Sequence, residues 1–247
     1  MIIYKLYLKI KQYASFAAKA LYHYVKHEVC LSYYYMRSNI DAAFLPFPIF
    51  TTASLLHRGA EFDEMFGSIA QALTYGFLYA YTIDVANNAE GGGLEDEINK
   101  PNRPIASKVT TATVTKTRYY ISTGVWLMYS YFLGIHQWTL GWVFTVFISY
   151  PLHTARFGPA KDLSMALGTV AQLMACWEIG GSGVEVGWNW VKIISIWVFF
   201  TVSIQDFRDV PGDRACGRWT TPMLLGDAAA RIYTSAALSV FAVSFFV

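Results

Sequence analysis

The chain has 247 residues, of which 55% are hydrophobic and 15% are charged, and its formal net charge is +2. Soluble domains of this size carry about a quarter charged residues, so the composition argues against an ordinary soluble protein. The nearly neutral charge and the lack of a Lys/Arg stripe argue against a nucleic-acid partner.

Residues 1–36 are predicted to form an amphipathic helix at a membrane surface. Lysines interrupt this aromatic and apolar stretch every few residues, at positions 5, 9, 11, 19 and 26. A cleaved signal peptide needs an unbroken apolar core of about 7–15 residues, which these lysines exclude. An amphipathic helix of this kind lies in the plane of the bilayer, with its apolar face toward the lipid chains.

The remaining residues, 37–247, are predicted to form a bundle that crosses the membrane seven times. No Asp, Glu, Lys or Arg occurs in the 37 residues from 119 to 155, a run too long for one crossing of about 20 residues. The expected spans cover residues 40–57, 66–86, 118–135, 138–155, 162–178, 188–206 and 228–247. The predicted fold class is therefore an all-α, multi-pass integral membrane protein with a single domain.

The basic residues predict how this bundle is oriented. Seventeen of the 19 Lys and Arg residues fall on the N-terminal segment, on loops that follow even-numbered spans, or at the matching end of the last span. Only Arg58 and Lys192 fall on the other side. Under the positive-inside rule, the basic side faces the cytoplasm. The expected membrane is that of the endoplasmic reticulum or another intracellular membrane.

Two groups of carboxylates follow the second and the sixth predicted spans. The first extends from Asp84 to Glu97 and the second from Asp206 to Asp213, and an even number of crossings places both on the cytoplasmic face. Carboxylates at the C-terminal end of a helix face the negative end of its dipole, so a cation would stabilise them. Mg²⁺ takes oxygen ligands and commonly bridges one or two carboxylates to substrate phosphates.

The predicted Mg²⁺ site draws ligands from both groups. Asp206 and Asp209 are spaced i, i+3, and Pro211-Gly212 is expected to turn the chain so that Asp213 comes back toward them. The complete set of candidate ligands is Asn88, Glu95, Asp96, Asp206, Asp209 and Asp213. Basic residues on the same face are predicted to neutralise a diphosphate. They are Lys100, Arg103, Arg156, Lys161, Arg214 and Arg218.

Five further residues are expected to have other roles, because acidic loops are more often solvated surface than metal sites. Glu90 and Glu97 are predicted to be solvated, and Asp84 to cap or orient rather than to bind metal. His153 and Glu178 lie within predicted spans, where each either lines a cavity or is satisfied by a local hydrogen bond.

At these residues the chain resembles the UbiA superfamily of intramembrane prenyltransferases, which carries two aspartate-rich motifs at the inner ends of its second and sixth helices. The stretch Gln205–Thr220 is similar to the DxxDxxGD motif of that family and its trailing Gly-Arg-x-Thr. The stretch Glu95–Pro104 is similar to the Glu-Asp-x-x-Asn-Lys-Pro-x-Arg-Pro form of a fungal branch. Gly92 stands where the usual first motif has its middle Asp, which leaves Asn88, Glu95 and Asp96 as ligands on that side.

The resemblance implies an enzyme in which Mg²⁺ assists the departure of diphosphate from a prenyl diphosphate, inside a bundle with a central cavity. The catalytic residues would be Asp206, Asp209 and Asp213. Most members transfer the prenyl group to an aromatic or quinone-precursor acceptor, whereas the fungal branch cyclises it to a terpene. The form of the first motif favours cyclisation here. A channel whose acidic rings select cations is a further alternative.

The resemblance also sets expectations for partners and for the extent of the bundle. A prenyl diphosphate and the lipid bilayer are the expected partners, and no obligate protein partner is indicated. The superfamily has nine membrane helices and this chain supplies seven. The last two helices are therefore expected to be missing, either naturally or by truncation.

Overall fold

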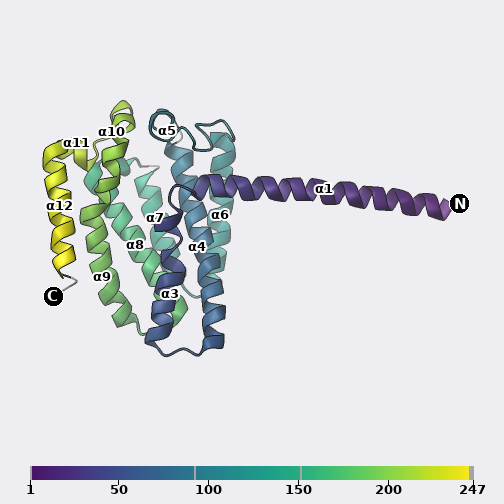
Figure 1. The fold of residues 1–247 in the computed structure, drawn as a ribbon, viewed down its shortest axis with the longest axis horizontal. Coiled ribbons are helices and arrows are strands. Elements are labelled where there is room, and N and C mark those ends of the chain that lie inside the picture. The colour runs from purple at the N-terminus through teal and green to yellow at the C-terminus, as the bar shows by residue number, and fades with distance from the viewer. Residues whose placement is uncertain (1, 92, 151, 245–247) are drawn as a thin grey trace.

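The computed structural model describes residues 2–91, 93–150 and 152–244, and these residues form an all-α fold (Figure 1). The predicted all-α class is thereby confirmed. The helices are α1 (Ile2–Met36), α2 (Ile40–Ala43), α3 (Pro46–His57), α4 (Phe62–Gly91), α5 (Leu94–Asn99), α6 (Ala112–Phe132), α7 (His136–Ser149), η1 (Thr154–Arg156), α8 (Gly158–Gly180), α9 (Val184–Thr201), η2 (Val202–Gln205), α10 (Asp206–Ala215), α11 (Thr221–Leu225) and α12 (Asp227–Ser244).

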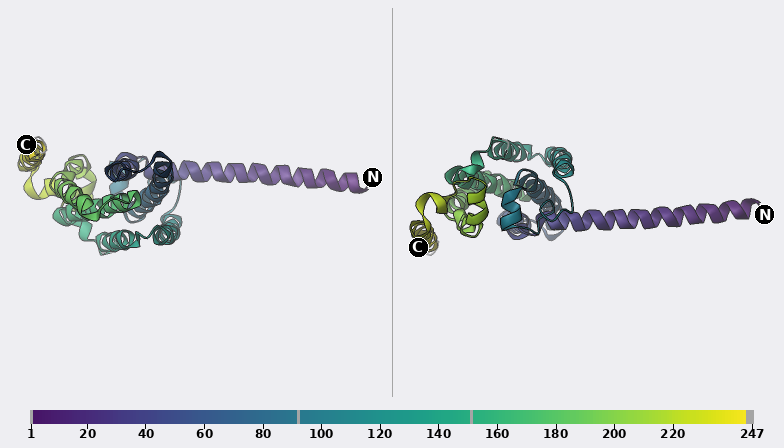
Figure 2. Two further views of the ribbon diagram at one scale, coloured as in Figure 1. Left: turned by 90° about the horizontal axis from the view of Figure 1, so that it is seen from below. Right: turned by 90° about the horizontal axis from the view of Figure 1, so that it is seen from above.

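The long helices α3, α4, α6, α7, α8, α9 and α12 run side by side, and the short helices α5, α10 and α11 lie together at one end of the bundle (Figures 1 and 2). In the described part of the chain, three helical stretches are long and apolar enough to cross a membrane: Ile40–His57, Gly158–Gly180 and Val184–Ala215. The seven long helices match the predicted spans in order, while seven crossings and a central cavity stay predictions.

The core that holds the bundle together is made largely of aromatic rings. Phe47 of α3 packs against Tyr75 and Tyr79 of α4, and Tyr79 also contacts Trp126 of α6 and Trp142 of α7. Aromatic pairs in such edge-to-face or offset contacts add to the stabilisation that burial alone gives. This shared core fixes the relative positions of α3, α4, α6 and α7, and α4 carries part of the first acidic group at its end.

Two predicted span ends are wrong, and both differences shape the polar end of the bundle. The second span was expected to end at residue 86, but α4 continues to Gly91, so that Asp84 and Asn88 lie on helix. The fourth was expected to reach residue 155, but α7 ends at Ser149. The sequence has proline at 151, and a proline removes a helical hydrogen bond and clashes with the preceding turn.

The predicted turn at Pro211-Gly212 is also wrong, because α10 continues through both residues to Ala215. Asp206, Asp209 and Asp213 are therefore spaced i, i+3 and i+7 on one helix, a spacing that places them on the same face. The amide of Gly212 donates a hydrogen bond of 3.0 Å to Asn99 Oδ1. This contact from α5 supports the helix where proline weakens its internal bonding.

Candidate functional site

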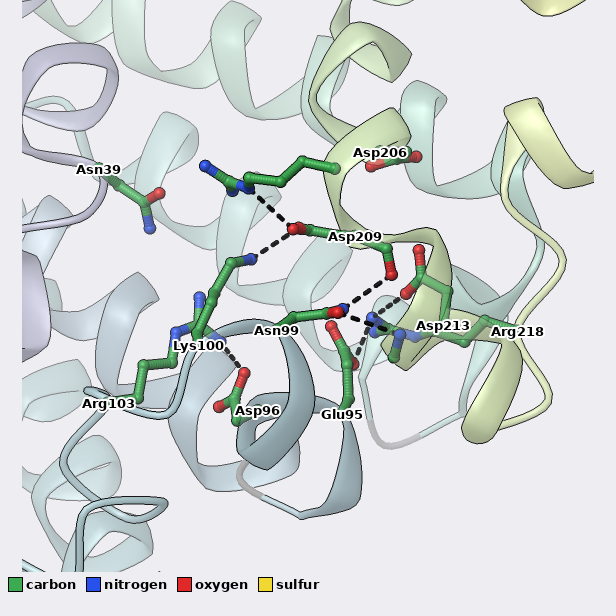
Figure 3. Close-up of polar contacts among 12 residues, drawn as sticks. Asn39, Glu95, Asp96, Asn99, Lys100, Arg103, Asp206, Asp209, Asp213 and Arg218 are labelled. Carbon is green, nitrogen blue, oxygen red and sulfur yellow. Dashed lines mark hydrogen bonds and ion pairs between the residues drawn. The ribbon is translucent and has the colours of Figure 1, made fainter. Parts of the chain in front are cut away.

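The two acidic motifs meet where α5 packs against α10 (Figure 3). Asn99, at the end of α5, donates from Nδ2 to the carbonyl oxygen of Asp209 at 2.8 Å. The next residue, Lys100, places Nζ 2.8 Å from Asp209 Oδ2. One motif thus binds the other through both a backbone and a side-chain contact.

Arg218, which follows α10, joins the motifs a second time. Its Nη1 lies 2.5 Å from Glu95 Oε2 of α5 and 3.3 Å from Asp213 Oδ1 of α10. Because one nitrogen contacts both carboxylates, they lie well within the roughly 10 Å that two metal ions and a diphosphate would bridge. The predicted convergence of the two motifs on one place is confirmed, whereas the role of each residue stays a prediction.

The other carboxylates of this cluster are also paired with basic side chains. Lys161 Nζ of α8 lies 2.5 Å from Asp206 Oδ1, and Arg103 Nη1 lies 2.8 Å from Asp96 Oδ1. Four of the six basic residues predicted to bind diphosphate therefore neutralise the predicted metal ligands in this geometry. Accordingly, among the residues described, no three His, Cys, Asp or Glu side chains are grouped closely enough to hold a metal ion.

The donor atoms nevertheless fit a metal such as Mg²⁺. Side-chain oxygens of Asn88, Asp96, Asp206 and Asp213 are buried and have no hydrogen-bond partner. A buried polar atom without a partner costs free energy, and a hard cation that seeks oxygen ligands would satisfy several such atoms at once. All four residues belong to the predicted ligand set.

Burial also affects the ionisation of the two acids on α5. It raises the pKa of Glu95 above its usual value, and the nearby Arg218 guanidinium opposes that change. The pKa of Asp96 is raised for the same reason, with Arg103 opposing. The charged forms of these carboxylates therefore depend on a neighbouring cation, whether a basic side chain or a metal ion.

The remaining two predicted diphosphate ligands, Arg156 and Arg214, are exposed. Within the described chain, neither forms an ion pair with a carboxylate. Arg156 lines a pocket of about 130 Å³ together with Glu95, His153 and Arg218. An anion in this pocket would contact a guanidinium that has no competing carboxylate. Arg214 is not part of this lining.

The structure places the residues that were given other roles as follows. Asp84 is almost fully buried and accepts a hydrogen bond from Asn39 Nδ2. Glu97 is exposed, as predicted. Glu178 accepts a hydrogen bond of 2.8 Å from Gln137 Nε2, so it has the local hydrogen bond that was one of its two expected roles. His153 lies outside α7 and lines the pocket.

The side chain of Glu90 and all of Gly92 lie outside the described residues.

Sequence reasoning missed two asparagines that organise the cluster. Asn99 links α5 to α10 through both its nitrogen and its oxygen. Asn39, at the start of α2, binds the carboxylate of Asp84. The position of Asn99 inside the Glu-Asp-x-x-Asn-Lys-Pro stretch was a usable signal, and Asn39 lies in the stretch Arg37–Asp41, which resembles the entry to the first helix of the family.

Replacing Gly212 with alanine should destabilise the protein, because a Cβ there would overlap the side chain of Asn99. Overpacking of this kind costs about 1–3 kcal/mol of unfolding free energy. A matched control is Gly124→Ala on α6, where a Cβ meets nothing within 4 Å. Thermal unfolding followed by circular dichroism checks the difference. Equal midpoints for the two variants would contradict the tight contact between α5 and α10.

The sequence profile of the UbiA prenyltransferase family matches residues 45–247. Somaliensene A/B synthase of Streptomyces somaliensis is 30% identical over 212 residues, which cover 86% of this chain and 71% of that protein. No solved structure matches the chain significantly.

Two proteins of the fungus Hericium erinaceus are also similar. Diterpene cyclase eriG is 33% identical over 162 residues, which are 62% of this chain and 51% of that cyclase, so the match spans about half its length. Polyprenyl transferase eriF is 27% identical over 215 residues, which are 84% of this chain and 72% of that protein. The similar proteins thus carry the names of both cyclising and transferring enzymes.

Proposed function

The chain belongs to the UbiA prenyltransferase family, and we propose that it ionises a prenyl diphosphate and cyclises the prenyl chain to a terpene. It is an enzyme that processes prenyl diphosphates, as the family match and the similar synthase show. With an enzyme family shown, the cation-channel alternative loses its basis. The observation that carries the proposal is the contact of Arg218 with both acidic motifs, which puts carboxylates and cations together at the end of an apolar bundle.

Members of this family typically use Mg²⁺, which supplies electrostatic stabilisation of charge on the departing diphosphate. The residues of this chain that would hold it are the candidate ligands on α4, α5 and α10, four of which keep a buried oxygen without a partner. The chemistry of this donor set suits a hard divalent cation.

The basic residues of the cluster would bind and orient the diphosphate. Lys100, Lys161 and Arg218 each contact a carboxylate now, and each could instead donate to a phosphate oxygen. As the carbon–oxygen bond breaks, the electron pair leaves with the diphosphate and an allylic cation remains. Cations positioned where negative charge develops stabilise the transition state more than the ground state.

The apolar bundle would protect the allylic cation from water, which would otherwise capture it. Aromatic ring faces attract cations. Tyr75, Tyr79, Trp126 and Trp142 lie in the aromatic core, where α4 packs with α6 and α7. In a cyclase, the double bonds of the prenyl chain itself capture the cation. The last cation then loses a proton to the released diphosphate or to a backbone carbonyl, which gives a neutral hydrocarbon, so no second substrate is needed.

A prenyltransferase is the alternative function, favoured by the similarity to the polyprenyl transferase named above. This reaction would use the same diphosphate site but would need a nucleophilic acceptor, such as a phenol or quinone precursor. The two proposals therefore differ only in what captures the cation.

We further propose that the bundle spans an intracellular membrane with the α5–α10 end on the cytoplasmic side. Arg58, one of only two basic residues assigned to the other side, follows α3 and bonds the carbonyl of Gly180 at the end of α8. Figure 1 shows that these ends of α3 and α8 lie opposite to α5 and α10. The distribution of basic residues supports the orientation.

The experiment that separates the two functions uses the full chain in lipid nanodiscs with geranyl, farnesyl or geranylgeranyl diphosphate. Each is supplied with Mg²⁺ or with EDTA, and with or without a phenolic or quinone-precursor acceptor. We expect Mg²⁺-dependent diphosphate release and a hydrocarbon product, detected by mass spectrometry, without an acceptor. Release only in the presence of an acceptor would establish the transferase instead. Consumption of no substrate in any mixture would refute both proposals.

A further inference from the structure

Helix α1 leaves the bundle and extends sideways away from it, across the direction of the long helices (Figures 1 and 2). Only its last turns contact the bundle. Leu31 and Tyr35 are buried against Val85 of α4, and Glu28 Oε2 lies 2.7 Å from Arg118 Nη1 of α6. Residues 9–27 are all exposed. This stretch, the free part of α1, packs on no other described element.

An apolar stripe runs along the free part of α1. Ile10, Tyr13, Ala17, Leu21 and Tyr24 follow one another at intervals of three or four residues, which places them on one helix face. The same spacing continues into the turns that pack on the bundle. Tyr13, Leu21 and Tyr24 are each more than 60% exposed, so this stripe is an apolar surface without a partner.

A second face of the free part is basic. Lys9, Lys19 and Lys26 are separated by ten and seven residues, which places Lys9 at the edge of the apolar stripe and Lys19 and Lys26 on the opposite face of the helix. No Asp or Glu occurs from residue 2 to residue 27. The first acid, Glu28, is already paired with Arg118. The free part therefore presents uncompensated positive charge on the polar face of an amphipathic helix.

We infer that the free part of α1 docks on anionic lipid headgroups of the leaflet at the α5–α10 end of the bundle. This inference rests on the bundle crossing the membrane, but not on the reaction proposed above. A helix that runs across the direction of membrane-spanning helices lies along the membrane surface. Its apolar stripe would enter the headgroup boundary and its tyrosines suit that depth, while its lysines would be attracted by the negative potential of the anionic headgroups.

The apolar stripe could also pack against the stripe of a second copy of α1, but the charges of the free part argue against such a dimer. Heptad-like stripes can pair as coiled coils, which acidic and basic residues beside the stripe usually stabilise. Residues 2–27 contain no acid, so two copies of the free part could form no ion pairs across such an interface. An anionic lipid surface complements the lysines of the free part.

The test places one copy of the full chain in each nanodisc, or two copies in a parallel set of larger discs, and labels α1 with an environment-sensitive fluorophore on a single introduced cysteine. Cys30 and Cys216 are first replaced by serine, since both are at least partly accessible. One label is placed on the apolar stripe by Leu21→Cys, and a matched label on the basic side by Gln12→Cys. Discs contain either phosphatidylcholine alone or added phosphatidylserine.

With phosphatidylserine, we expect blue-shifted emission from the label at position 21 and water-like emission from the label at position 12. A variant that combines Lys9→Gln, Lys19→Gln and Lys26→Gln should have a lower ratio of docked to free helix. Each lysine contributes about fivefold, so the ratio should fall on the order of 100-fold. The corresponding three Lys→Arg substitutions keep the charge and should keep the shift.

Three results would overturn the inference. The first is water-like emission from position 21 in every disc. The second is a blue shift that is equally large in discs of phosphatidylcholine alone and in the Lys→Gln variant. The third is a blue shift only in discs that hold two copies. The last result would identify self-association. Turnover of prenyl diphosphate in the same discs reports separately on the proposed reaction.

Discussion

Replacing Asp209 or Asp213 with alanine should abolish prenyl diphosphate turnover while the protein still inserts into membranes. Both carboxylates are buried on one face of α10, and each contacts a basic residue that links the two motifs. Loss of a ligand that helps a metal stabilise leaving-group charge costs several kcal/mol in the transition state. Turnover should therefore fall at least roughly 10²-fold.

Diphosphate release in nanodiscs measures this effect, and the yield of membrane-inserted protein shows whether the variants fold. The matched control is Asp227→Ala, because Asp227 is exposed and, among the residues that the structure describes, pairs only with Arg231. Turnover in that variant should match the unmodified protein. Near-normal turnover in both Asp209→Ala and Asp213→Ala would show that the metal, if bound, uses other ligands.

Replacing Arg218 with alanine should reduce both stability and turnover, because this guanidinium contacts a carboxylate from each motif. The Arg218 side chain is only 16% exposed, and Asp213 is almost completely buried. Removing one partner of a buried ion pair leaves an uncompensated charge and costs about 3–5 kcal/mol of unfolding free energy. The same change removes a predicted contact with the diphosphate.

Arg218→Lys distinguishes charge from geometry, since lysine keeps the charge but replaces the planar guanidinium with a compact ammonium group. We expect intermediate stability and intermediate turnover for this variant. Arg231→Ala is the control, because Arg231 is a partly exposed arginine whose ion pair lies outside the cluster. Thermal unfolding and diphosphate release give the two readouts. A stable and fully active Arg218→Ala variant would contradict the linking role.

The structure adds to the sequence motifs a specific electrostatic arrangement at the candidate site. The acids of both motifs form ion pairs with Lys100, Arg103, Lys161 and Arg218. Among the described residues they do not form a group of three that could hold a metal ion without rearrangement. Binding of a metal together with diphosphate would let these cations turn from carboxylates to phosphates. One set of side chains could then serve both the free and the occupied site.

The sequence alone was sufficient for the all-α class, the order of the long helices and the family. These features depend on local properties, namely long apolar runs, the placement of basic residues and two short motifs. It also predicted that the acidic motifs converge. That inference needed only the number of crossings between them, and the contacts of Arg218 confirm it.

Only the tertiary structure decided how the candidate site is assembled. The sequence suggested a turn at Pro211, whereas α10 continues through it with support from Asn99 of α5. It offered no partner for Asp84, which Asn39 binds. It listed basic residues for a diphosphate but not their pairing with particular acids. Such contacts join residues far apart in the chain, so they depend on how helices pack, and no local pattern specifies them.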